Sequence, residues 1–151
     1  MTNPIYSPPV DQVTTAVLGL LNTTGRTVYD GAYGGDPTSP AYPFGILYSL
    51  AGGSTDALPD LDDERQHITL AYQVSTVSNL RNQCEATARL FHDRLTARRD
   101  GSHVYALPMP TGWVCINRRA DPAQPGTDPD GTPPARVFTR PARYLLTITP
   151  A

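Results

Sequence analysis

The chain has 151 residues with a net charge of −2, and apolar residues make up 39% of it. This length fits one domain, since folding at this size buries about 70% of the surface of the unfolded chain. The slight negative charge excludes a general attraction to nucleic acid or anionic membranes. No segment approaches the ~18 consecutive apolar residues of a membrane span. The N-terminus has no basic residue ahead of an apolar run, so we expect no secretory signal and a soluble protein.

Lysine is absent, and all 12 basic residues are arginines. This excludes a phosphate-loop lysine, a Schiff-base lysine and a catalytic amine. The two cysteines, Cys84 and Cys115, form no C-x-x-C pair, and each lies among apolar neighbours. We therefore expect two free, buried thiols and no disulfide.

The N-terminal segment predicts a helix followed by a short strand. Over residues 9–21, apolar residues recur at steps of three and four, which is the period of a one-sided helix. Two prolines suit its start, and residues 22–25 suit its end. Residues 27–29 then favour a short strand, and a loop rich in glycine and proline follows over residues 30–42.

The next two segments predict an antiparallel hairpin with a long connection. Residues 43–50 predict a strand in which one face is formed by Phe44, Ile46, Tyr48 and Leu50. Residues 66–77 give the strongest strand pattern, in which one face is formed by Ile68, Leu70, Tyr72, Val74 and Thr76. A polar loop is expected over residues 51–65, and it contains an acidic run at Asp60, Asp62, Asp63 and Glu64.

The segment that follows predicts a second amphipathic helix. Its apolar stripe is formed by Leu80, Cys84, Ala88, Phe91 and Leu95. Charges of alternating sign form a solvated ion-pair face on the opposite side, at Arg81, Glu85, Arg89 and Asp93. Either Ser78 or Asn79 is expected to cap the start of this helix.

The C-terminal third predicts strands separated by a long loop. Residues 103–106 indicate a short strand and residues 113–118 a better one. The last strand runs to Thr149. Pro141 cannot donate to a strand ladder, so it marks a bulge, a strand start or an exposed edge. The loop over residues 120–135 is far longer than an ordinary connection, which is typical of functional or projecting loops.

The order of these elements predicts an α+β fold. Because most strands follow one another directly, we expect a largely antiparallel sheet of about four to six strands, with both amphipathic helices packed on one face. Residues 1–151 are expected to form a single domain with projecting loops at about 51–65 and 120–135.

No segment carries a recognisable catalytic or cofactor-binding motif. The glycine-rich residues 31–35 lie between two strands instead of opening a helix, which predicts a loop. Asp128 and Asp130 resemble the start of a calcium loop, but Pro133 occupies the required glycine position, so a turn is favoured. The three histidines lack the spacing of a metal-ligand pair. We therefore expect no enzyme activity, no cofactor and no metal site.

Four short strings lie in order along nearly the whole chain. They are Val28-Tyr29-Asp30-Gly31, Tyr42-Pro43-Phe44-Gly45-Ile46-Leu47-Tyr48, Tyr72-Gln73-Val74-Ser75-Thr76-Val77-Ser78 with Arg81-Asn82-Gln83-Cys84, and Phe138 with Arg143-Tyr144-Leu145-Leu146-Thr147-Ile148-Thr149-Pro150-Ala151. In these strings the chain resembles the tail terminator proteins of long-tailed phages, which cap the tail tube and join it to the head. It departs from the family pattern at Ser78, where members often carry glycine, and at Cys84, where they often carry alanine.

The resemblance implies a homohexameric ring in the neck of a virion, assembled in the host cytoplasm. One side of the ring would stack on the major tail-tube protein and the other would bind a head-proximal connector or stopper protein. Viral DNA would pass through the lumen without sequence-specific binding, and no membrane or catalytic residue takes part. Ring closure requires two different complementary patches on each subunit. The candidate lumen or inter-subunit contacts are Asp60, Asp62, Asp63, Glu64, Arg98, Arg99, Arg118, Arg119, Asp121, Asp128 and Asp130.

The two arginine pairs among these residues could grip phosphate. Since no aromatic stripe is interleaved with them, we favour salt bridges to carboxylates within or between subunits. Two other functions stay open. The chain could be another neck component, such as a head–tail connector or tail-completion protein. It could also be a small metal-dependent hydrolase that uses Asp30, His67 and the acidic loop.

Overall fold

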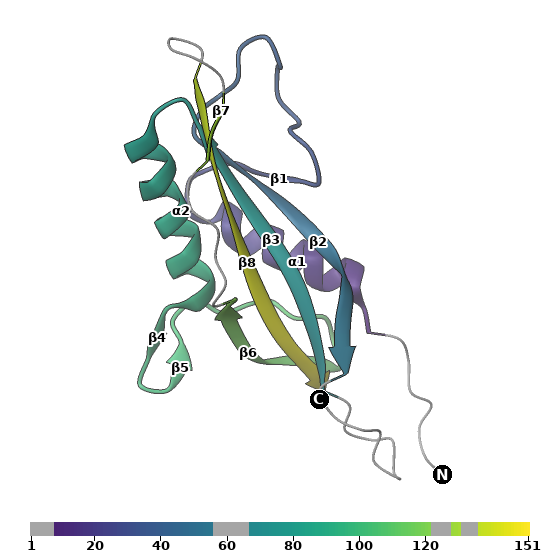
Figure 1. Cartoon of the computed structure of the whole chain (residues 1–151). Helices are drawn as coiled ribbons and strands as arrows, with labels where there is room; N and C mark the ends of the chain where they lie inside the picture. Colours follow the sequence, from purple (N-terminus) through teal and green to yellow (C-terminus); the bar gives the residue numbers. More distant parts are fainter. Residues whose placement is uncertain (1–7, 56–66, 122–127, 131–135) are drawn as a thin grey trace, which may run out of the picture.

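The computed structural model describes residues 8–55, 67–121, 128–130 and 136–151. Within them, two helices accompany a six-stranded sheet with the order β1-β2-β3-β8-β6, in which β7 also pairs with β8 (Figure 1). The helices are α1 (Val10–Asn22) and α2 (Arg81–Thr96). The strands of the sheet are β1 (Val28–Asp30), β2 (Phe44–Thr55), β3 (Ile68–Ser78), β6 (Trp113–Ala120), β7 (Asp128–Asp130) and β8 (Val137–Pro150). A separate hairpin is formed by β4 (Arg98–Arg99) and β5 (Ser102–His103).

Three long antiparallel strands, β2, β3 and β8, form the centre of the sheet. The predicted hairpin of the second and third strands is confirmed, as is the α+β class. The first pair differs from the expectation, because β1 runs parallel to β2, with Tyr29 opposite Ile46. Parallel neighbours need a crossover connection instead of a tight turn, and residues 31–43 provide it.

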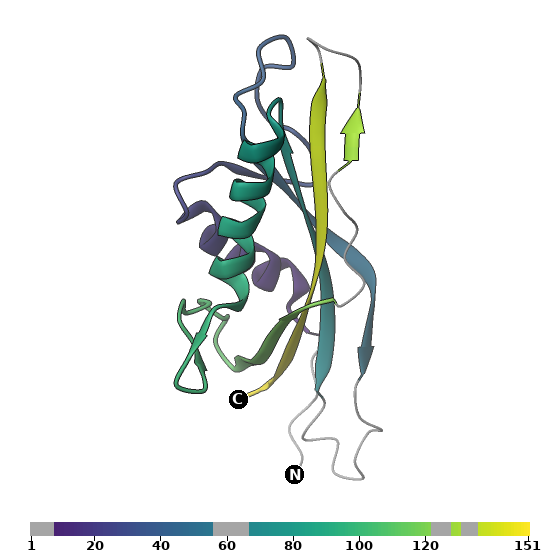
Figure 2. The ribbon, with the colours of Figure 1, turned by 60° about the vertical axis from the view of Figure 1, so that its left-hand side comes forward.

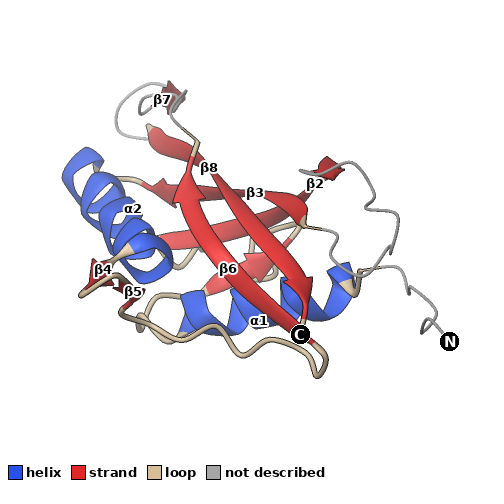
Figure 3. Cartoon of the chain, turned by 90° about the horizontal axis from the view of Figure 1, so that it is seen from below, coloured by secondary structure: helices blue, strands red, loops and turns tan. Residues whose placement is uncertain are grey.

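Both helices cover the same face of the sheet, as expected (Figures 2 and 3). Alternate residues of β3 and β8 point toward them, since side chains alternate along a strand. The register places Tyr72 opposite Tyr144 and Val74 opposite Ala142 on this face. The main core residues are Val13, Val17, Leu21, Tyr72, Val74, Phe91, Leu95, Tyr144, Leu146 and Ile148.

In β2, the apolar face predicted from the sequence lies away from the helices. Leu47 pairs with Val74 and belongs to the core, so the alternate set, which begins with Phe44 and Ile46, lies on the other face. Phe44 is nevertheless buried, because Tyr33 of the preceding loop packs against its ring at 4.5 Å between centroids. This loop therefore covers part of the helix-free face.

The start of α2 differs from the prediction. Its N-cap is Leu80, which makes no side-chain capping bond and is 59% exposed, so Leu80 does not belong to the buried stripe. The Ser78 hydroxyl accepts a bond from the Leu80 N–H at 3.3 Å and donates to Gln83 Oε1 at 2.9 Å. The other four stripe residues are buried, and the charged face is exposed as expected.

The predicted loops contain more strand than expected. β2 continues through Thr55, into the predicted loop of residues 51–65, and β7 lies inside the predicted loop of residues 120–135. Of the strand predicted at residues 103–106, only His103 is in a strand, because the chain first turns through the β4–β5 hairpin. Both cysteines are free, with Cys84 buried and Cys115 half-buried.

Candidate functional site

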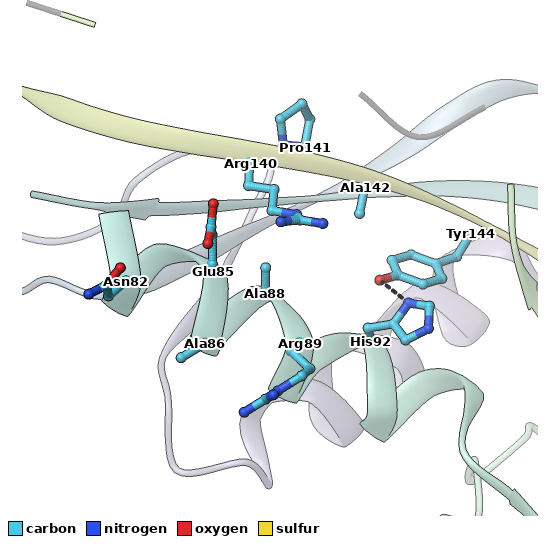
Figure 4. A pocket seen from close by; sticks show the side chains of 10 residues that line it. All are labelled: Asn82, Glu85, Ala86, Ala88, Arg89, His92, Arg140, Pro141, Ala142 and Tyr144. Atoms are coloured by element: carbon cyan, nitrogen blue, oxygen red, sulfur yellow. Dashed lines mark hydrogen bonds between the residues drawn. The ribbon is translucent and has the colours of Figure 1, made fainter. Parts of the chain in front are cut away.

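A groove of about 550 Å³ separates α2 from β8 (Figure 4). Arg140, Ala142 and Tyr144 point from β8 toward the helix, whereas Pro141 points away from it. The groove is open because its facing residues are small: Ala88 on α2 and Ala142 on β8. The complete lining is Asn82, Glu85, Ala86, Ala88, Arg89, His92, Arg140, Pro141, Ala142 and Tyr144.

Among the described residues, the outer edge of β8 is paired on either side of a short stretch beside this groove. Among the described strands, β7 pairs with β8 as far as Thr139 and β6 pairs with it from Tyr144 onward. The Asp121 N–H donates to the Arg143 carbonyl at 2.9 Å, so Arg143 directs its backbone groups to this edge. Because backbone groups alternate along a strand, Pro141 also faces the edge. A proline at this position leaves no N–H without a partner, and of the three positions predicted for Pro141 the described strands place it at a strand edge.

The groove therefore presents an edge that is poorly suited to adding another strand. Strand addition uses a row of N–H and C=O groups, and the donor is missing at Pro141. An α-helix or protruding side chains of a neighbouring molecule fit this surface better, since its sides carry charges of both signs at Glu85, Arg89 and Arg140.

At the inner end of the groove, Tyr144 and His92 are in contact. The Tyr144 hydroxyl and His92 Nδ1 are 3.2 Å apart, and burial is the main cause that raises the pKa of Tyr144 above its ordinary value. The phenol is therefore neutral at physiological pH, which suits a structural hydrogen bond. In the described part of the chain, no three His, Cys, Asp or Glu side chains are grouped to hold a metal ion.

The structure places the predicted contact residues in three groups. Asp121 and β7, which contains Asp128 and Asp130, lie along the outer edge of β8 near the groove. Arg98 and Arg118 line a second cavity of about 460 Å³ between the β4–β5 hairpin and β6. The exposed Arg99 and Arg119 line neither cavity. The acidic run lies outside the described residues: Asp60, Asp62, Asp63 and Glu64.

Within the described chain Arg118 is held by a backbone carbonyl, and the predicted salt bridge to a neighbouring subunit stays a prediction. Only 5% of Arg118 is exposed, and its Nη2 donates to the backbone carbonyl of Tyr105 instead of to a carboxylate. The register of β6 turns Arg118 toward the helix side of the sheet, because it pairs with the core residue Leu146. Burial is the main cause that lowers the pKa of this guanidinium.

Comparison with solved structures finds a match over nearly the whole chain. A chain in the structure described as "Virion of native gene transfer agent (GTA) particle" aligns with a TM-score of 0.61 and 12% sequence identity. The alignment covers 95% of this chain and 99% of that chain. The two chains share a fold. No protein-family model matches the sequence, and no curated protein does.

Several residues of the two cavities could not be found from the sequence. His92 lies on the polar side of α2, and its contact with Tyr144 joins residues 52 positions apart. His103 lacks the spacing of a metal-ligand pair in the sequence, yet it lines the second cavity beside Arg118. Within the described residues, no helix is long and apolar enough to cross a membrane.

Proposed function

We propose that this protein is a non-enzymatic structural component of a phage-like virion. Copies of the chain form a homohexameric ring that closes the tail tube and joins it to the head-proximal connector. The observation that carries the proposal is the full-length likeness of its fold to a chain of a gene transfer agent virion. The order of the four sequence strings supports the narrower assignment to a tail terminator.

Two separate surfaces of the described chain support a head-to-tail ring, which needs different complementary patches on each subunit. The first is the α2–β8 groove together with Leu80, which is 59% exposed at the start of α2. The second, which we call the β5–β6 patch, contains four apolar residues that are 36–47% exposed: Val104, Tyr105, Val114 and Ile116. Exposed apolar residues gathered in this way are typical of interfaces. We propose that the groove of one copy receives the β5–β6 patch of the next.

In this arrangement the remaining charged residues act at the lumen or between subunits. The acidic loop of residues 60–64 would give the lumen a negative lining, which keeps passing DNA from adhering. The tail-tube protein and the connector bind the two faces of the ring.

Light scattering on the purified protein tests the ring. Six copies of the 16.3 kDa chain give a mass of about 98 kDa. Ile116→Asp and Leu80→Asp place a charge in either patch, so each variant is expected to be monomeric with an unchanged circular dichroism spectrum. Gln12→Asp, on the exposed side of α1, is the control and keeps the mass of the ring. A wild-type protein that is monomeric both at high concentration and when bound to tail tubes contradicts the proposal.

Electron cryo-microscopy of the particle tests the position of the protein. We expect density for this fold at the head-proximal end of the tail tube. Density in the neck without contact to the tube favours a connector instead. A place outside the head–tail junction overturns both assignments.

A further inference from the structure

The second cavity is strongly basic. It lies between the β4–β5 hairpin, the segment after it and β6, and its volume is about 460 Å³. Arg98, Arg118 and His103 line it, and none of its described lining residues is acidic. A cavity with cationic groups and no counter-charge favours an anion.

Arg118 is the central cation of this cavity. It is 5% exposed, and its Nη1 is buried with no hydrogen-bond partner in the described structure. An arginine side chain stays charged in proteins, and a buried charge that lacks partners is costly. One arm of the guanidinium is already held by the Tyr105 carbonyl. The other arm is left to bind an acceptor.

His103 provides the second binding group. Both of its ring nitrogens, Nδ1 and Nε2, are buried without a hydrogen-bond partner in the described structure. Burial, followed by the charges of Arg118 and Arg98, lowers its pKa, so the ring is neutral at pH 7. A neutral imidazole offers one N–H donor. Arg98 is partly engaged, since its Nη2 donates to the Gly101 carbonyl at 2.7 Å.

We infer that this cavity binds a carboxylate, whose two oxygens accept hydrogen bonds from Arg118 and His103. Two donors match two oxygens, and a guanidinium beside a neutral imidazole matches a single negative charge. A phosphate or sulfate dianion has more charge and more acceptors than these groups satisfy. Leu107, Met109 and Ile116 form an apolar part of the lining, which fits a carboxylate carried on an apolar stem.

The carboxylate could belong to a small organic acid or to an acidic side chain of a second copy of this chain. Both have the same chemistry, and Tyr105, Val114 and Ile116 of the β5–β6 patch line the cavity in either case. The inference does not depend on the proposed ring.

The test measures the pKa of His103 by following the NMR signals of its imidazole protons as a function of pH. These signals are assigned by comparison with the variant His103→Gln, in which they are absent. Sodium butyrate is the probe, and phosphate and sulfate are compared at the same ionic strength. Butyrate is expected to raise the pKa of His103, because a bound anion favours the charged imidazolium. If a second copy supplies the carboxylate, the pKa rises with protein concentration in the absence of butyrate.

Arg118→Gln should bind butyrate about tenfold more weakly, since a charged hydrogen bond is lost. Arg118→Lys retains the charge and is the second variant in case the first does not fold. Arg119→Gln is the matched control, because Arg119 is exposed and pairs with Leu145 on the helix-free face. This control is expected to bind like the wild type.

A pKa of His103 that responds to neither butyrate nor protein concentration overturns the site, and so does an undiminished response in both Arg118 variants. A larger response to phosphate or sulfate overturns the assignment to a carboxylate. A protein that responds to butyrate but is monomeric both at high concentration and when bound to tail tubes retains this site and contradicts the ring, so the two proposals fail separately.

Discussion

Gly45 in β2 shows how single residues set the distance between the helices and the sheet. A Cβ atom built on Gly45 would lie 2.8 Å from Cε2 of Phe91 on α2, and Phe91 is itself fully buried. Glycine lets the helix approach the sheet here. The opposite case is Gly19 in α1, where a Cβ would meet nothing within 4 Å.

We expect Gly45→Ala to lower the free energy of unfolding by about 1–3 kcal/mol, because the added methyl group overpacks the core. Gly19→Ala, in the interior of α1, is the matched variant and should raise the free energy of unfolding by about 0.5–1 kcal/mol. The reason is that alanine gives the unfolded chain less conformational entropy than glycine does. Urea unfolding measures both values. Equal effects of the two substitutions would contradict the close packing at Gly45.

The buried tyrosines predict how stability depends on alkaline pH. Burial raises the pKa of Tyr144 and of Tyr72 above the ordinary value of 10.0. The unfolded chain therefore loses these protons first. The contribution of the two protonated tyrosines to the stability of the folded chain is fully present below pH 10.0. It is lost as the pH rises through the folded-state pKa values.

We expect the free energy of unfolding to decline above about pH 10 in urea titrations. Tyr144→Phe should make this decline less steep, because its titrating group is gone, although the bond to His92 is lost at every pH. An identical slope in the variant would show that Tyr144 does not cause the decline.

At the scale of elements, Ser78 connects the end of β3 to the start of α2. Its hydroxyl is fully buried and bonds both the Leu80 N–H and the Gln83 side chain. It acts two residues before the N-cap, so it fixes the turn and not the first helical residue itself.

Ser78→Ala is expected to destabilise the protein by about 1–2 kcal/mol, since two hydrogen bonds at the helix start are lost. Asn79→Ala, at the exposed neighbouring position, should change stability by about 0.5 kcal/mol or less. Thermal unfolding of both variants checks the difference. A larger loss of stability in Asn79→Ala than in Ser78→Ala would show that Asn79 caps the helix instead.

For the whole molecule, the last strand in the sequence holds the sheet together. β8 lies between β3 and β6, also pairs with β7, and contributes Tyr144, Leu146 and Ile148 to the core. The domain therefore depends on contacts between residues that are distant in the sequence.

A chain that ends at residue 136 is expected to show no cooperative urea transition. Without β8, β3 loses one of its two neighbouring strands, and the core loses the side chains of Tyr144, Leu146 and Ile148. Removal of Ala151 alone is the control, and it should cost about 1 kcal/mol through the lost bond from its N–H to the Gly112 carbonyl. Cooperative unfolding of the shorter chain would contradict the central role of β8.

The sequence alone determined the elements whose patterns are local. The one-sided period of α1, the alternation in β3 and the stripe from Cys84 to Leu95 follow from backbone geometry. The α+β class followed from their order. Tertiary structure decided which face of a strand is covered, because the face depends on pairing: Leu47 reaches the core through its register with Val74. Pairing of β6 with β8 likewise buried Arg118, and packing of α2 beside β8 brought His92 to Tyr144. These outcomes rest on contacts between distant segments, which no local pattern contains.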